Sequence, residues 1–170
     1  YMNQILSDLY VRDSVTGLYN RMGYQKLSIS YFTIMREKKM PVLVMFIDLD
    51  RLKYINDTFG HEYGDFAIIS IAKAMLKHCD ADAIAARTGG DEFIVLEGAK
   101  DEESGRVLAQ KIRTELSKTQ RAMQLPFDLS ASIGAVVAHP GEENVLESYV
   151  KRAEMLMYEE KAEKKVSRDS

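Results

Sequence analysis

The sequence has few of the residues that cross-link small proteins or bind zinc in them. It contains one cysteine, Cys79, and three histidines among 170 residues. A single cysteine excludes an internal disulfide and is typical of proteins in a reducing compartment. The histidines and the cysteine do not occur at zinc-ligand spacings, so a zinc site is not expected. A chain of this length can bury a sufficient core without either kind of cross-link.

Long apolar runs and an excess of positive charge are also lacking. No run approaches the roughly 20 residues that span a bilayer, and no signal-peptide pattern opens the chain. The formal net charge of −3 and the isoelectric point of about 5.7 argue against a surface that coats nucleic acid. We therefore expect one cytoplasmic domain without direct membrane insertion. It is either free or the output domain of a membrane-anchored receptor.

Hydrophobic periodicity predicts an α/β sandwich. Helices are expected at 21–39, 52–59, 64–77, 103–118 and 145–164, and strands at 42–47, 83–86, 93–96 and 127–137. The helical spacing places Val107 and Leu156 among the buried residues. Strand 42–47 is apolar throughout, which favours a central strand buried on both faces. Because a hairpin interrupts the alternation of helices and strands, we expect a mixed β-sheet flanked by helices in two or three layers.

The first residues predict a separate short helix. Met2, Ile5, Leu6 and Leu9 fall on one face of it. Two interpretations remain open: this helix is the end of a stalk or coiled coil from an upstream module, or it docks on its own domain. We divide the chain into an N-terminal helix at 1–11, as the end of such a linker, and a folded domain at 12–170.

Two glycines followed by two acids form the most distinctive motif. The motif lies between two apolar stretches and reads Arg87-Thr88-Gly89-Gly90-Asp91-Glu92-Phe93. Glycines at a hairpin tip permit positive φ and a close approach of the backbone to a ligand. Adjacent carboxylates repel each other unless a cation lies between them. The motif therefore predicts a divalent metal site at the tip of a hairpin.

A second acidic pair ends the predicted central strand. Asp48 and Asp50 are two residues apart, so both project to the same side of a strand. Together with Asp91 and Glu92 they outline an oxygen-rich site of the kind that Mg²⁺ prefers when it also binds substrate phosphates. An alternative for Asp50 is a cap of the following helix.

Polar residues are dense directly after this strand, over 53–65. Asn56 and Asp65 are candidates to read a purine edge, because a carboxylate accepts from the paired N–H donors of guanine. The alternative for each of them is a helix cap or an Asx turn. His61, taken alone, has a structural interpretation as well as a functional one.

Five sequence blocks, in order, resemble the GGDEF domain of diguanylate cyclases. They cover about residues 12–165 and read RDSVTGLYNR, FIDLDRLKYINDTFGHEYGD, RTGGDEF, LSASIGAVVA and RAEMLMYEEK. The resemblance implies a fold related to the palm of nucleotide polymerases and to class III nucleotidyl cyclases. It also implies a Mg²⁺-dependent enzyme, with Mn²⁺ as a possible substitute, that converts two GTP into cyclic di-GMP and two pyrophosphates.

The resemblance also implies residue roles. The metal ligands would be Asp48, the backbone carbonyl of Leu49, Asp91 and the supporting Glu92. Asp91 would also accept the proton of the 3′-hydroxyl, and Lys53 would stabilise charge on the transferred phosphoryl group. The remaining residues would bind the substrate: Asn56, His61, Asp65, Gly89, Gly90, Lys161 and Lys165. At position 165 the family commonly has Arg, and Lys keeps the charge but loses the bidentate fork.

A single domain offers a single nucleotide site, so joining two GTP molecules requires two domains face to face. We therefore expect a transient homodimer whose formation an upstream sensor controls. Many family members carry an inhibitory product site, RxxD, before the hairpin. Here the matching residues are Asp80-Ala81-Asp82-Ala83, so that site is lacking. An alternative function is a catalytically silent module that binds GTP or cyclic di-GMP and regulates a neighbouring domain.

Overall fold

The computed structural model describes residues 1–170, which form an α/β sandwich around a four-stranded sheet. The strand order is β2-β3-β1-β4, and the bounds are Val42–Leu49 for β1, Ile84–Arg87 for β2, Glu92–Gly98 for β3 and Ala131–Ala138 for β4. The predicted α/β class and the central strand are confirmed. All three strand pairs are antiparallel, so the expectation of a mixed sheet is wrong.

The antiparallel pairing follows from how the helical crossovers interleave. The helices after β1 lead to β2, which runs in the same direction as β1, but β3 lies between these two strands. Likewise, β4 runs in the direction of β3, and β1 separates them. Two crossover units that share one sheet in this way form a split βαβ arrangement. Parallel pairing is limited to an isolated bridge between Tyr19 and Ala86.

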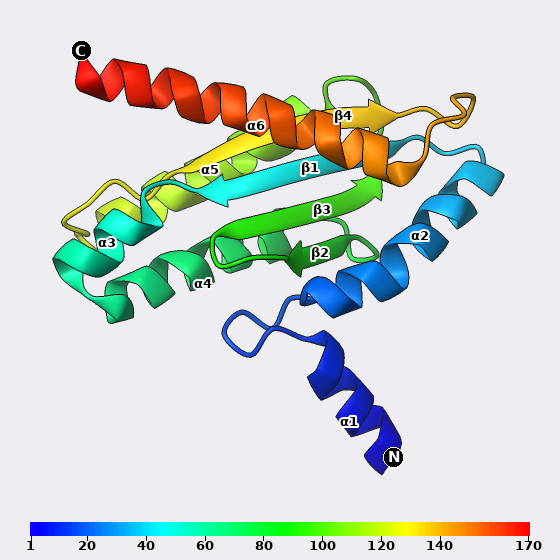
Figure 1. The fold of residues 1–170 in the computed structure, drawn as a ribbon, viewed down its shortest axis with the longest axis horizontal. Helices are drawn as coiled ribbons and strands as arrows, with labels where there is room; N and C mark the ends of the chain where they lie inside the picture. The colour runs from blue at the N-terminus through cyan, green and yellow to red at the C-terminus, as the bar shows by residue number, and fades with distance from the viewer.

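Helices cover both faces of the sheet, which gives three layers (Figure 1). One face carries α3 (Leu52–Phe59), α4 (His61–His78) and α5 (Ser104–Ala122), and the other carries α2 (Arg21–Glu37) and α6 (Leu146–Asp169). All eight residues of β1 are buried, with odd-numbered side chains packed toward α4 and α5 and even-numbered ones toward α2 and α6. Strand β1 therefore lies between the two cores along its whole length.

Three local expectations need correction. Val107 and Leu156 are both 41% exposed. Each lies at the edge of the buried face of its helix, and that face is narrower than the helical spacing of apolar residues suggested. The last strand begins at Ala131 and not at 127; Phe127 and Leu129 are buried within the preceding loop.

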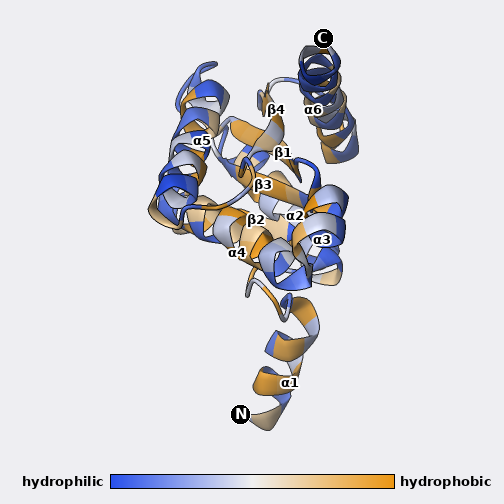
Figure 2. Cartoon of the chain, turned by 90° about the vertical axis from the view of Figure 1, so that its left-hand side faces the viewer, coloured by the Kyte–Doolittle hydropathy of each residue, from blue (hydrophilic) through white to orange (hydrophobic).

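Helix α1 (Met2–Val11) buries none of its residues and projects away from the rest of the chain (Figure 1). Figure 2 shows apolar residues along it, and Leu9 is 71% exposed. The docked interpretation of this helix therefore finds no support, while the division of the chain at residue 11 stays a prediction. None of the helices combines the length and the apolar character needed to cross a membrane.

Candidate metal and nucleotide site

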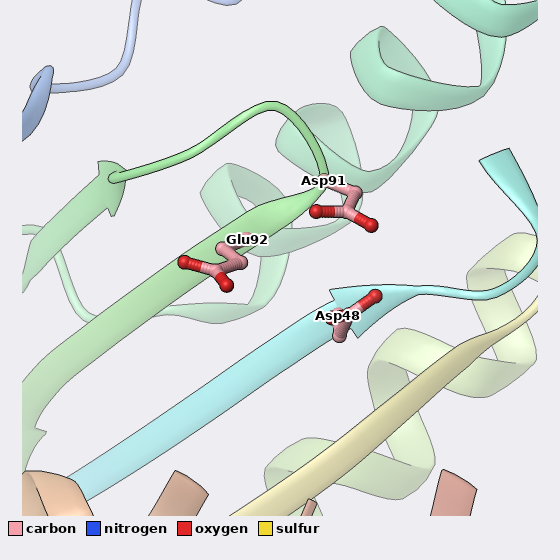
Figure 3. A group of neighbouring side chains, drawn as sticks. All are labelled: Asp48, Asp91 and Glu92. Atoms are coloured by element: carbon pink, nitrogen blue, oxygen red, sulfur yellow. The ribbon is translucent and has the colours of Figure 1, made fainter. Parts of the chain in front are cut away.

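Three carboxylates meet where β1 ends and β3 begins (Figure 3). Asp48 lies opposite Glu92 in the antiparallel register, and Asp91 precedes Glu92 in the turn. One carboxylate oxygen of each lies within 4.8 Å of the others. The backbone N–H of Leu49 donates to the carbonyl of Asp91 at 2.9 Å, which fixes the hairpin against the end of β1. The structure thus brings together the predicted metal ligands from positions more than 40 residues apart.

The electrostatics of this group favour a cation. Burial, together with the charges of Asp91 and Glu92, raises the pKa of Asp48 to about 6 although Lys161 acts to lower it. Burial and the charge of Asp91 also raise the pKa of Glu92. Neighbouring carboxylates disfavour one another's ionisation, and a bound divalent ion would stabilise them as anions. Mg²⁺ prefers oxygen ligands, and all three side chains supply oxygen atoms. The donor chemistry of the three residues therefore fits the expected metal.

Asp50 takes no part in this group, contrary to the expectation of four clustered acids. Its side chain is 6% exposed and accepts hydrogen bonds from Ser132 Oγ (2.6 Å), Ser130 Oγ (2.7 Å) and Lys164 Nζ (2.7 Å). It does not cap the next helix either, since α3 begins after Arg51 without a side-chain cap. The spacing of two residues correctly placed both acids on the face of the sheet that α6 covers. Their different partners on β4 and α6 give them different roles.

The hairpin tip is braced by two arginines to which no role was given from the sequence. Arg21 donates twice to the carbonyl of Thr88, at 3.0 and 2.8 Å. Arg87 donates to the carbonyl of Gly90 at 3.2 and 2.8 Å and forms an ion pair of 3.2 Å with Asp13. All three charged residues lie in sequence blocks that carry the family resemblance, which is the signal that could have revealed them.

The two glycines of the motif do not adopt positive φ, so that part of the prediction is wrong. Among glycines only Gly17 and Gly60 have positive φ. Four residues separate β2 from β3, and a loop of this length does not require the left-handed conformations of a two-residue turn. Gly89 lies against the Glu92 side chain, where a Cβ would come 3.0 Å from Oε2, whereas Gly90 faces open space. Small size, rather than backbone conformation, therefore explains Gly89.

The predicted purine-reading residues lie on the helix pair α3–α4. Asn56 is half-buried, and a Cβ added to Gly64 would overlap its side-chain oxygen. Gly64 thus allows the Asn56 amide to lie directly against α4. His61 and Asp65 are exposed on the first part of α4. The structure therefore groups these polar side chains beside the start of α4.

The predicted basic residues differ in their surroundings. Lys161 donates to Asp48 Oδ1 at 2.8 Å, so it joins the acidic group directly. Lys53 is 91% exposed and pairs with Asp57 at 3.0 Å on the surface of α3. Lys165 is exposed on α6. Of these three lysines, only Lys161 contacts the group formed by Asp48, Asp91 and Glu92.

Comparisons with known proteins agree with this geometry. The family model described as "Diguanylate cyclase, GGDEF domain" matches residues 10–167. A diguanylate cyclase of Vibrio cholerae, VdcA, is 34% identical over 88% of this chain and 43% of its own length. The cyclic di-GMP phosphodiesterase NbdA of Pseudomonas aeruginosa is 28% identical over 88% of this chain and 19% of its own length. The chain thus spans less than half of either relative.

The fold is shared with a solved microbial GGDEF domain whose interaction with cyclic di-GMP has been described. The two structures superpose with a TM-score of 0.75 at 28% sequence identity, over 90% of this chain and 94% of the other. The polymerase-palm-like fold expected from the sequence is therefore confirmed.

Proposed function

Because the chain belongs to the GGDEF domain family, we propose that it is a diguanylate cyclase, a nucleotidyltransferase that converts two GTP into cyclic di-GMP and two pyrophosphates. One observation carries this proposal: Asp48, Asp91 and Glu92 converge at the ends of two adjacent strands, with Lys161 against them. Degenerate modules of this kind have little use for a complete acidic group, because its mutual repulsion costs stability.

Asp48, Asp91 and Glu92, with the Leu49 carbonyl, would hold the Mg²⁺. When bound, this ion supplies positive charge that activates the nucleophile and neutralises the leaving group. Asp91 is the proposed acceptor of the proton from the 3′-hydroxyl. The 3′-oxygen then forms a bond to the α-phosphorus of the other GTP, and the α–β anhydride bond breaks to release pyrophosphate. Lys53 is proposed to stabilise the developing charge, which requires its side chain to leave Asp57.

The nucleotide is proposed to lie between the hairpin and the α3–α4 pair. Asn56 and Asp65 would bind the guanine edge, and the acid at position 65 favours GTP over ATP. His61, Gly89 and Gly90 would contact the nucleotide, and Lys161 and Lys165 would contact the terminal phosphates. The uncapped start of α3, directly after β1, also favours phosphate groups.

One nucleotide site per domain requires two copies face to face. We propose a transient homodimer through these faces, controlled by an upstream sensor or dimerisation module. The exposed apolar α1 is suited to the end of such a linker. The working compartment would be the cytoplasm.

The decisive test is a product analysis at increasing protein concentration, with GTP and Mg²⁺. We expect cyclic di-GMP and pyrophosphate in a ratio of about 1:2, at a rate that rises more than linearly with protein concentration because two copies must meet. ATP in place of GTP should give little product. Comparable consumption of ATP would contradict the assignment of Asp65 to guanine.

Feedback inhibition at residues 80–83 is not expected. No arginine is present there, and Asp80 and Asp82 lie near Glu97, whose pKa is raised by burial and by the negative charges of these two acids. This negative region would repel the phosphates of a dinucleotide. Cyclic di-GMP should therefore leave the rate unchanged. Inhibition that is lost in an Asp80→Ala, Asp82→Ala variant would show the reasoning to be wrong.

A silent nucleotide-binding module is the second candidate. The observation that favours it is the match to a relative named as a cyclic di-GMP phosphodiesterase. In that case the protein would bind GTP or cyclic di-GMP in an equilibrium titration but form no product at any protein concentration.

A further inference from the structure

Two lysines on α6 each bind an acid at the end of β1. Lys161 Nζ lies 2.8 Å from Asp48 Oδ1, and Lys164 Nζ lies 2.7 Å from Asp50 Oδ2. The lysine side chains are almost equally exposed, at 36% and 35%, and both acids are buried. Figure 1 shows α6 crossing over β1 and β4 on the way to this end of the sheet. The two ion pairs are therefore similar in length and in the exposure of the lysine.

The Lys164 pair is complete in itself. Besides Asp50, Lys164 donates to the backbone carbonyl of Ala131 at 2.7 Å and pairs with Glu160 at 3.2 Å. Asp50 receives two serine hydroxyls in addition to the ammonium group. Other protein groups fill the remaining hydrogen-bonding positions of both partners, and removing Lys164 would leave the buried Asp50 carboxylate without its counter-charge. Lys164 is thus a fixed tie between α6, β4 and the end of β1.

The Lys161 pair is incomplete. Asp48 is the single hydrogen-bond partner of the Lys161 ammonium group. Asp48 also faces the carboxylates of Asp91 and Glu92, so the Lys161 ammonium group faces three acids, with help from the charge of Arg21 at Glu92. A divalent ion bound by these acids would repel the ammonium group and replace its contribution to the charge balance.

We propose that Lys161 is an exchangeable counter-ion, which competes with the divalent metal for Asp48 and, once displaced, becomes free to bind nucleotide phosphates. Lys164, by contrast, is a positioning residue that holds the strand end during this exchange. The inference rests on the proposed function, because it assumes that the acidic group binds a metal. It follows that metal and nucleotide bind cooperatively, because metal binding frees the Lys161 ammonium group to bind a nucleotide phosphate.

The test is a Mn²⁺ titration, followed by electron paramagnetic resonance at pH 8 without nucleotide, of the wild type and two charge-removing variants. Lys161→Met should bind Mn²⁺ about fivefold more tightly, because loss of a partly exposed ion pair removes about 1 kcal/mol of competition. The matched control, Lys164→Met, should not tighten Mn²⁺ binding but should lower the melting temperature. Lys161→Arg keeps the charge and should restore the wild-type Mn²⁺ affinity.

A second titration measures the coupling with the α,β-methylene analogue of GTP, which cannot be cleaved at the reacting bond. In the wild type, saturating Mg²⁺ should tighten analogue binding. In Lys161→Met the analogue should bind more weakly and Mg²⁺ should enhance its binding less. A residue that only contacted phosphate would weaken the analogue while leaving Mn²⁺ affinity unchanged, and a residue that only supported the fold would weaken both.

Unchanged or weakened Mn²⁺ binding in folded Lys161→Met, as checked by circular dichroism, would overturn the inference. The titrations do not depend on turnover, so the two proposals fail separately. A wild type that binds Mn²⁺ and shows the predicted shift, but forms no cyclic di-GMP, would refute the cyclase and support the exchange. A wild type that binds no Mn²⁺ would refute both.

Discussion

Asp50→Asn is predicted to destabilise the fold without weakening the metal site. The change removes the charge of a buried carboxylate that accepts three side-chain hydrogen bonds, and its own N–H donates to the carbonyl of Ser130 at 2.9 Å. An asparagine side chain keeps one acceptor oxygen. Its NH₂ group would face either the Lys164 ammonium group or a serine hydroxyl, so at least one strong hydrogen bond is lost.

The expected cost follows from these contacts. A hydrogen bond to a charged group contributes about 1.5–3 kcal/mol, and removing one partner of a buried pair costs about 3–5 kcal/mol. Lys164 is 35% exposed and can be rehydrated, so the lower part of this range applies. We expect a loss of about 2–4 kcal/mol in the free energy of unfolding. For a domain of this size that corresponds to a fall of about 4–16 °C in the melting temperature.

The pH dependence provides an independent check. Burial alone would raise the pKa of Asp50, but hydrogen bonds from Lys164, Ser132 and Ser130 outweigh it and hold the pKa below its usual value. The stabilisation is therefore present above the unfolded-state pKa of about 3.9 and is lost as pH falls through the folded-state pKa. The difference between wild type and Asp50→Asn should be full at pH 7 and should shrink below about pH 4.

Urea unfolding followed by circular dichroism measures the free energies, and a Mn²⁺ titration measures the metal site. Asp48→Asn is the contrasting variant: it should lose metal affinity, whereas Asp50→Asn should keep it. A free energy of unfolding within 0.5 kcal/mol of wild type, a threshold of about the scatter of surface substitutions, would refute the role given to Asp50. So would a loss of Mn²⁺ binding equal to that of Asp48→Asn.

Three further predictions concern other parts of the molecule. Asp91→Ala should lower kcat by about 10²–10⁴-fold while leaving the melting temperature close to wild type, since a half-buried turn residue contributes little to packing; an active variant in a cyclic di-GMP assay would exclude it as the base. Gly134→Ala should destabilise by about 3 kcal/mol or more in thermal unfolding, because the new Cβ would overlap the carbonyl of Ala153, and a neutral effect would show that α6 can shift. Burial, the largest cause, outweighs the hydrogen bond from the Asp80 N–H and raises the pKa of Glu97, so its ionisation costs stability as pH rises above about 4.3. Glu97→Gln should raise the melting temperature at pH 8 but not at pH 4, and equal effects at both would contradict this.

Local patterns were sufficient to predict most elements and the acids of the candidate metal site. The helix at 52–59 has the predicted bounds, and the buried strand predicted at 42–47 is longer at its end, which lies at Leu49. Apolar periodicity is a local property of the chain, so it predicts helices and strands without knowledge of the tertiary contacts. Asp48 and the motif acids were found because carboxylates at a strand end and in a turn are placed by those elements alone.

The sequence could not distinguish the two acids at the end of β1. Asp48 and Asp50 have the same residue type, the same strand parity and neighbouring positions. Their roles are decided by partners 82, 113 and 114 residues away: Ser132 and Lys164 bind Asp50, whereas Asp48 is bound by Lys161 and belongs to the candidate metal site. Only the tertiary structure brings β4 and α6 to this strand end. Periodicity determines which side a residue faces, and packing determines what it meets there.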